Sequence, residues 1–170
     1  MQRIAAIFDG LRFSESTLHY AILLAKQEEA HLTGIFPHDF TYNSFSMYKL
    51  LKEGASQSVI REYEDADRAR RDASTSIFEA ACQKMRIPYN IHHNKSISLL
   101  EALEESIYAD LMIIDAGETF VRDEMKPPTR FMRDMLSDVQ CPVLVVPSSQ
   151  WVPPAFADIE KTVMLYDGEP

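Results

Sequence analysis

Two aspartates each follow directly on a short apolar run, which makes them candidates for metal binding or acid–base chemistry. Asp9-Gly10 follows the apolar run 4–8, and Asp115 follows the apolar run 111–114. Two carboxylates at neighbouring strand ends can share Mg²⁺ or act as a general acid and a general base. We favour the simpler alternative, in which Asp9 caps a turn and Asp115 faces solvent.

Other residues with reactive side chains have structural explanations. His92 and His93 are adjacent, so a strand points them to opposite faces and they cannot readily hold one metal ion. Ser14 lacks a Gly-x-Ser-x-Gly elbow and fits a helix N-cap. Cys82 and Cys141 are too few for a disulfide framework or a zinc site, and we predict that both are packed thiols. We therefore predict no catalytic residue and no metal site.

Some cations and one histidine are weaker candidates for binding a ligand. Arg122, Lys126 and Arg130 gather after the 111–114 run and are candidates for holding an anion, with ordinary surface charge as the alternative. His38-Asp39 comes just after the predicted strand 32–36 and is a candidate for orienting a ligand, although a surface loop is favoured. The dense basic cluster at residues 68–71 lies among acidic residues, so it is not taken as a nucleic-acid site.

Composition excludes several classes of function. The chain has 170 residues, 17 Lys and Arg against 26 Asp and Glu, and a net charge of −9. Nucleic-acid binding needs a basic face, so duplex binding and docking on an anionic membrane are disfavoured. No apolar run approaches the roughly 18 residues of a membrane span, and the N-terminus has no secretory signal pattern. We expect one reduced, cytoplasmic, soluble protein.

The elements that must position these residues alternate between strands and helices. Strands are predicted over 4–8, 32–36, 89–93, 111–114 and 143–146, and most are apolar throughout, which is typical of a parallel sheet. Strand 89–93 alternates more and is expected at an edge. Helices are predicted after Ser14, over 47–51, over 57–84, from Ser98 and over 130–136. The order predicts an α/β fold with an open parallel sheet and helices on both faces.

Two of these helices carry specific predictions about their buried faces. The helix over 57–84 is predicted to be mostly exposed, with these residues facing inward: Val59, Ile60, Ala66, Ala73, Ile77 and Ala80. The helix from Ser98 is predicted to bury one apolar face: Leu99, Leu100, Leu103 and Ile107.

Four features make residues 1–147 resemble a universal stress protein domain. They are Asp9-Gly10 at the end of the first strand, Ser14-Glu15-Ser16 at the start of a helix, Ala109-Asp110-Leu111 before the fourth strand, and the closing Cys-Pro-Val-Leu-Val-Val of 141–146. The resemblance implies a Rossmann-like sheet of five strands in the order 3-2-1-4-5, frequent dimers and fusion of two copies in one chain. In that order Asp9 and Asp115 end neighbouring strands, at the switch point where ligand crevices form.

The resemblance also allows a test for nucleotide binding. Nucleotide-binding members of the family carry Gly, two residues, Gly, about nine residues and then Gly-Ser or Gly-Thr after strand four, so that phosphates can lie against backbone N–H groups. Here Asp115 and Glu118 occupy the two Gly positions, and Thr129-Arg130 occupies the Gly-Ser position. Gly117 is one residue out of register. A carboxylate beside a triphosphate costs on the order of a few kcal/mol, so ATP with Mg²⁺ is disfavoured and no cofactor is expected.

These observations favour a non-catalytic stress-response domain that is not an enzyme and acts through dimerisation or partner contacts. The alternative is a nucleotide or small-anion binder with a remodelled pocket near Asp9 and the 115–130 loop, and with the base near the end of strand two. Its candidate ligand-binding residues are Asp9, Gly10, Phe36, Pro37, Asp115, Gly117 and Arg130. A metal-dependent enzyme using Asp9 and Asp115 is a third, disfavoured reading.

The C-terminal residues resemble the N-terminus. Residues 148–160 are rich in Pro and small residues and are predicted to be a linker. Residues 161–168 match residues 3–10 in character, with a basic residue, an apolar run, an aromatic residue and Asp-Gly. We interpret residues 161–170 as the start of a second repeat, with a chance resemblance or an extra strand as the alternative. The tail is expected to pair with the strand-five edge, in a homodimer or with a second copy of the domain.

Overall fold

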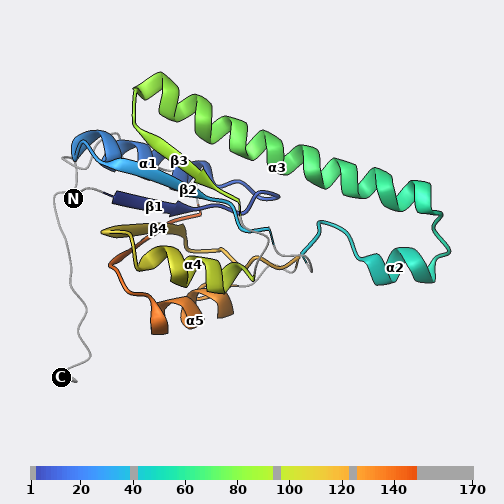
Figure 1. Cartoon of the computed structure of the whole chain (residues 1–170). Helices are drawn as coiled ribbons and strands as arrows, with labels where there is room; N and C mark the ends of the chain where they lie inside the picture. Colours follow the sequence, from blue (N-terminus) through green and yellow to red (C-terminus); the bar gives the residue numbers. More distant parts are fainter. Residues whose placement is uncertain (1–2, 39–41, 94–96, 123–125, 149–170) are drawn as a thin grey trace.

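Five parallel strands form one sheet in the order β3-β2-β1-β4-β5, which confirms the predicted topology (Figure 1). The computed structural model describes residues 3–38, 42–93, 97–122 and 126–148. The strands are β1 (Arg3–Ile7), β2 (His31–Ile35), β3 (Tyr89–His92), β4 (Leu111–Asp115) and β5 (Val143–Val146). The helices are α1 (Glu15–Gln27), α2 (Met47–Lys52), α3 (Gln57–Met85), α4 (Ser98–Ser106) and α5 (Arg130–Asp138).

Helices cover both faces of the sheet, as the apolar strands predicted. Alternate residues of β1 enter two different cores, because successive side chains of a strand point to opposite faces. Ile4 and Ala6 join the core under α1 and α3, whereas Ala5 and Ile7 join the core under α4 and α5. Figure 1 shows α1 and α3 on one side of the sheet and α4 and α5 on the other. Strand β1 is therefore enclosed on both faces and paired on both edges.

The predicted inward face of α3 is wrong at most positions, and only Val59 and Ile60 are half-buried. Ala66, Ala73 and Ala80 are exposed, and Ile77 is 48% exposed. The buried residues are Asp67, Ser74, Phe78 and Cys82. Two of these four are polar, so a hydrophobic pattern could not identify the face.

A glycine in β2 fixes the position of α3. The ring of Phe78 packs directly over Gly34, where a Cβ atom would lie only 2.8 Å from ring carbons. Phe78 is fully buried and makes edge contacts with the rings of Phe8 and Phe36 at 5.6 and 5.9 Å. The absence of a side chain at Gly34 thus sets how closely α3 approaches the sheet.

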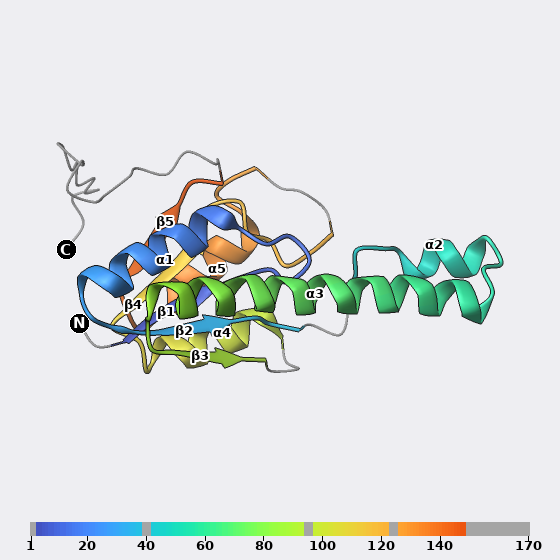
Figure 2. The same cartoon turned by 90° about the horizontal axis from the view of Figure 1, so that it is seen from above.

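The N-terminal part of α3 extends beyond the sheet, with α2 beside it (Figure 2). Its 29 residues span about 43 Å at 1.5 Å per residue. Asp67 is the first buried residue of α3, and it accepts hydrogen bonds from the backbone N–H of Ser44 at 2.8 Å and from the Ser44 hydroxyl. The rings of Phe45 and Tyr63 lie 5.3 Å apart. We call residues 44–66 the helical arm.

The predicted apolar face of α4 is also partly wrong. Leu100 is 52% and Ile107 is 62% exposed, while the buried residues of the helix are Ser98, Glu101, Ala102 and Ser106. The Ser106 hydroxyl donates to the carbonyl of Leu103 at 2.7 Å and accepts from the backbone N–H of Gln140 at 3.0 Å. Small polar side chains with internal partners can therefore face the packed side of α4.

Two sequence predictions fall on residues that the structure does not describe. The proposed linker extends past Ser148, and the proposed start of a second repeat at 161–170 lies wholly outside the described residues. Within the described ranges, none of the helices combines the length and the apolar character needed to span a membrane.

Candidate functional site

Asp9 lies at the carboxyl end of β1 and is the centre of a buried hydrogen-bond network. Its side chain is 1% exposed. Oδ1 accepts from the backbone N–H of Leu11 at 2.8 Å, and Oδ2 accepts from Arg12 Nε at 3.0 Å and from the Tyr42 hydroxyl at 2.6 Å. Asp9 therefore caps a turn, as expected, and it also binds two side chains.

Arg12 connects the end of β1 to the segment that follows β4. Its Nη2 atom donates to Thr119 Oγ1 at 2.7 Å and to the carbonyl of Val121 at 2.9 Å, and it lies 4.0 Å from Glu118 Oε1. Partial burial alone would lower the pKa of Arg12, but the hydrogen bond to Asp9 and the neighbouring charges raise it above its ordinary value. The guanidinium is thus a permanent positive charge between two acidic groups.

Glu118 turns its carboxyl group back onto its own loop. Oε1 accepts from the backbone N–H of Thr119 at 2.9 Å and from that of Phe120 at 3.2 Å. Burial, and then the negative charge of Asp9, raise the pKa of Glu118 to about 7. The backbone N–H groups of Thr119 and Phe120 therefore donate to Glu118 Oε1, and they are not available as donors for an anion.

Asp115 is buried and does not face solvent, so the favoured prediction for this residue is wrong. It is 8% exposed. Its Oδ2 accepts from the Ser14 hydroxyl at 2.7 Å, and its Oδ1 accepts from the backbone N–H of Gly117 at 2.8 Å and from the Ser148 hydroxyl. Ser14 also caps α1, as predicted, by accepting from the backbone N–H of Thr17 at 3.1 Å. Asp115 thus ties together the ends of β4 and β5 and the start of α1.

The two aspartates end neighbouring strands, as predicted, but they have different partners. Within the described ranges, no three His, Cys, Asp or Glu side chains are grouped so that they would hold a metal ion. We call the connected residues around these strand ends the carboxyl-end network: Asp9, Arg12, Ser14, Tyr42, Asp115, Glu118 and Thr119. Its arrangement satisfies the acidic groups with donors from the same chain.

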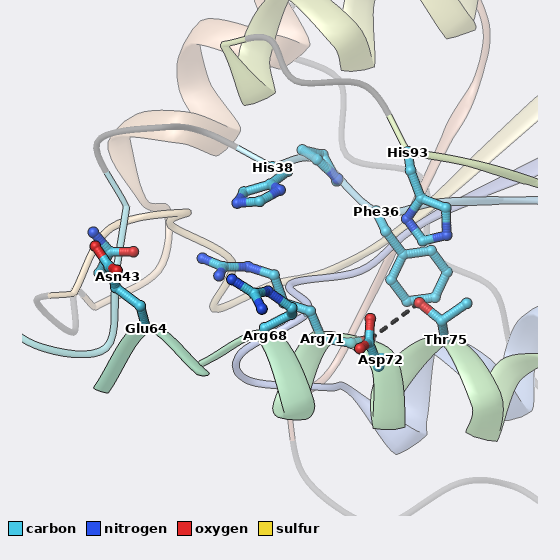
Figure 3. Close-up of a pocket in the computed structure, with 11 residues that line it drawn as sticks. Phe36, His38, Asn43, Glu64, Arg68, Arg71, Asp72, Thr75 and His93 are labelled. Atoms are coloured by element: carbon cyan, nitrogen blue, oxygen red, sulfur yellow. Dashed lines mark hydrogen bonds between the residues drawn. The ribbon is translucent and has the colours of Figure 1, made fainter. Parts of the chain in front are cut away.

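A separate pocket of about 460 Å³ opens beside α3 (Figure 3). Segments after β1, β2 and β3 form one side of it, and α3 forms the other. Its lining is Gly10, Phe36, Pro37, His38, Asn43, Glu64, Arg68, Arg71, Asp72, Thr75 and His93. We call it the α3 pocket.

The candidate site residues from the sequence are divided between these two places. Gly10, Phe36 and Pro37 line the α3 pocket. Asp9 and Asp115 belong to the carboxyl-end network, and Gly117 contributes its backbone N–H to Asp115. Arg130 lies apart in the first turn of α5, where it pairs with Asp134 at 3.5 Å. The candidate residues thus fall partly in the α3 pocket and partly in the carboxyl-end network.

The adjacent histidines diverge as the strand geometry predicted. His92 pairs with Glu105 of α4 at 2.5 Å, whereas the ring of His93 lies 5.7 Å from that of Phe36 and lines the α3 pocket. His38 lines the same pocket, and Asp39 lies outside the described residues.

Both thiols are packed. Cys82 is fully buried, and burial followed by the charge of Glu79 raises its pKa to about 12. Cys141 is half-buried, and burial followed by the charge of Asp110 raises its pKa as well. Neither residue has the lowered pKa of a reactive thiolate.

Arg12, Tyr42, Arg68 and Arg71 were missed as site residues by reading the sequence. A weak signal existed for Arg12, because it follows Asp9 by three residues, within reach for a local ion pair. Arg68 and Arg71 are three apart on a helix and so share a face. No local signal connects Tyr42 to Asp9, because the two residues are 33 positions apart in the sequence.

The fold defines a Rossmann-like α/β protein with a parallel sheet in the order 3-2-1-4-5. No family model matches the sequence, and no curated protein matches it. Among solved structures, the universal stress protein UspA from Lactobacillus plantarum is similar with a TM-score of 0.59 and 16% identity, over 85% of this chain and 97% of that one. The chain thus has the fold of the universal stress proteins, which confirms the fold that the resemblance implied.

Two further similar structures hold nucleotides. A universal stress protein family protein from Arabidopsis thaliana, with AMP bound, has a TM-score of 0.56 and 10% identity, over 88% of this chain and 94% of that one. The universal stress protein from Archaeoglobus fulgidus, in complex with dAMP, has a TM-score of 0.53 and 13% identity, over 86% of this chain and 97% of that one. At these identities the similarity concerns the fold.

Proposed function

We propose that this chain is a stress-response domain of the universal stress protein type that does not use the nucleotide site of its nucleotide-binding relatives and is not an enzyme. It acts instead through contacts with a second copy of the domain or with another protein. The observation that carries the proposal is the carboxyl oxygen of Glu118, which occupies the backbone N–H groups of Thr119 and Phe120.

The charges around this loop support the same conclusion. Phosphate binding needs free backbone donors and positive charge. Here the carboxyls of Asp9, Asp115 and Glu118 surround the strand ends, and the guanidinium of Arg12 is bonded to Asp9 and Thr119. A triphosphate placed here would have to displace these bonds and would then face carboxylates. The alternative of a remodelled nucleotide site near Asp9 and the 115–130 loop is therefore disfavoured.

The outer edge of β5 is the surface that best supports contacts with a second copy of the domain or with another protein. Strand β5 pairs with β4, and within the described residues no strand pairs with its other edge. Val145 is 41% exposed, and Val143 and Leu144 are half-buried. An edge strand with apolar side chains and unpaired backbone groups can add a strand from another chain or domain. Pairing of two copies through this edge fits the dimers that the resemblance implies.

Calorimetric titration of the full chain with ATP and Mg²⁺ tests the loss of the nucleotide site. We expect no binding with micromolar affinity. The positive control restores the family residues at four positions, Asp115→Gly, Glu118→Gly, Thr129→Gly and Arg130→Ser, and its folding is checked by circular dichroism. Micromolar binding of ATP to the unmodified chain that Arg68→Gln leaves unaffected would contradict the proposal.

A further inference from the structure

We propose that the α3 pocket is a binding site for a phosphate monoester, held by Arg68 and Arg71. This site adjoins the carboxyl-end network through Tyr42, but none of the residues that replace the family's glycine motif lines it. The inference goes beyond the proposed function, because a ligand here needs neither the loop after β4 nor the amides that Glu118 occupies.

Arg71 is positioned by Gly10, which follows β1, and by Tyr42, which follows β2. Its side-chain stem packs against Gly10, where a Cβ atom would lie 3.0 Å from Arg71 Cγ. Its Nη2 atom donates to the carbonyl of Tyr42 at 2.8 Å. These two contacts hold the guanidinium in the pocket. A guanidinium carries five N–H donors, and no other described residue accepts from that of Arg71.

Arg68 brings a second guanidinium to the same pocket. It precedes Arg71 by three residues, so both lie on one face of α3. Figure 3 shows the two side chains extending from the helix in the same direction, toward His38 on the opposite wall. Two guanidinium groups that converge on one cavity repel each other, and an anion between them removes that repulsion.

Among the described residues, neither arginine belongs to a buried ion pair. Arg68 pairs with Asp65 at 3.1 Å, but the two side chains are 71% and 68% exposed, and such exposed pairs contribute little. Arg71 makes no ion pair with any residue in the described part of the chain. Glu64 and Asp72 also line the pocket, and both are exposed residues.

The remaining walls accommodate an apolar body attached to the phosphate. Phe36 is 4% exposed, Pro37 is buried, and the ring of His93 lies 5.7 Å from the Phe36 ring. The volume of about 460 Å³ is within the usual range of small-molecule sites. A guanidinium fork matches the geometry of phosphate oxygens, and a monoester carries close to two negative charges near pH 7, enough to engage both arginines.

Titration of the full chain with phenyl phosphate and with inorganic phosphate, followed by calorimetry, tests this assignment. We expect saturable binding of both, with phenyl phosphate tighter because its ring contacts the apolar wall. Arg68→Gln should weaken phenyl phosphate binding about tenfold, the effect of losing one charge-assisted contact. The matched control Arg61→Gln makes the same charge change on α3 outside the pocket and should leave the affinity within about twofold.

A second variant tests the position of Arg71 without changing any charge. Gly10→Ala places a methyl group against the Arg71 stem and should weaken phenyl phosphate binding while Arg61→Gln does not. Thermal melting of each variant shows that the fold is retained, and Arg68 is exposed enough for its variant to fold.

Three results would overturn the assignment. One is the absence of saturable phenyl phosphate binding up to about 10 mM, a level that corresponds to negligible affinity. Another is an equal loss of affinity in Arg68→Gln and Arg61→Gln, which would indicate that the phosphate is attracted by the positive charges of α3 in general and not by this pocket. The third is tighter binding of benzoate than of phenyl phosphate, which would indicate that the pocket prefers a carboxylate ligand to a phosphate monoester. An ATP affinity that Arg68→Gln abolishes would support this pocket and leave the proposed loss of the glycine-motif site intact.

Discussion

In the carboxyl-end network, the protonation of Glu118 can be measured through its effect on the stability of the protein. Burial and the charge of Asp9 raise its pKa from an ordinary value of 4.5 to about 7. The folded chain therefore holds this proton more tightly than the unfolded chain does. Stability from this group is fully present below about pH 4.5 and is lost as the pH rises through about 7.

Replacing Glu118 with Gln should remove this pH dependence. Gln keeps a side-chain oxygen for the amides of Thr119 and Phe120 but never ionises. We expect the free energy of unfolding of the wild type, relative to Glu118→Gln, to fall by on the order of 2 kcal/mol between pH 5 and pH 8. Urea denaturation at the two pH values measures this difference.

The control is Glu62→Gln, which removes a carboxyl from the exposed surface of α3. The unfolding free energy of this variant should depend on pH as that of the wild type does, because the Glu62 side chain is exposed to solvent in the folded chain as in the unfolded chain. If the unfolding free energy of Glu118→Gln also depends on pH as that of the wild type does, Glu118 is not held as a protonated group in the fold.

The sequence revealed the position of Glu118 but not its role. The resemblance aligned Glu118 with a glycine of the family motif and so predicted the loss of a phosphate site. That the carboxyl bonds to its own backbone depends on the loop conformation, in which Phe120 has a positive φ of 49°. Arg12 and Tyr42 complete the arrangement through contacts over 107 and 33 residues of sequence, which no local pattern encodes.

At the scale of elements, the packing of α3 on β2 depends on one glycine. Gly34→Ala places a methyl group 2.8 Å from the ring of Phe78, and Phe78 is fully buried in the core. We expect a loss of roughly 1–3 kcal/mol in the free energy of unfolding, which is the usual range for overpacking a core. Chemical denaturation measures this loss.

A double-mutant cycle separates this clash from a change in strand propensity. In a Phe78→Leu background the smaller side chain leaves room for the methyl group, so Gly34→Ala should cost much less there. An equal cost in both backgrounds would show that the contact between Gly34 and Phe78 does not limit the approach of α3.

The elements differed in how much of them could be predicted from sequence. The strands could be located because both of their faces are buried, which leaves apolar runs such as 4–8 and 111–114 with clear ends. The strand order came from the resemblance and is confirmed. The buried face of α3 could not be predicted, because Asp67 and Ser74 are buried through hydrogen bonds to Ser44 and Gly10 that join distant parts of the chain.

At the scale of the whole molecule, the proposed pairing through β5 predicts that the protein forms a dimer in solution. Val145→Lys adds a charge to the exposed edge strand, a substitution that opposes strand addition. If two copies pair through this edge, we expect the dissociation constant of the dimer to rise at least about tenfold. Sedimentation equilibrium of the full chain measures that constant.

Val121→Lys is the matched control, because Val121 is 42% exposed, nearly the same as Val145, and lies outside β5. It should keep the mass of the unmodified protein. A wild type that is monomeric at high concentration, or the same weakening in both variants, would contradict pairing through β5.

The two halves of the long helix α3 should differ in how often their backbone hydrogen bonds break. Its C-terminal half is anchored on the sheet by Ser74, Phe78 and Cys82, so its backbone amides should exchange their hydrogens with solvent only when the sheet itself unfolds. From Gln57 to Ala66 no residue of the helix is buried, and the ring of Phe45 packs against Tyr63 in this part. These outer turns can therefore melt and re-form while the sheet stays intact. Because α3 carries Arg68 and Arg71 just inside this boundary, a ligand bound there would slow exchange in the outer turns and extend the rigid part of the molecule into the arm.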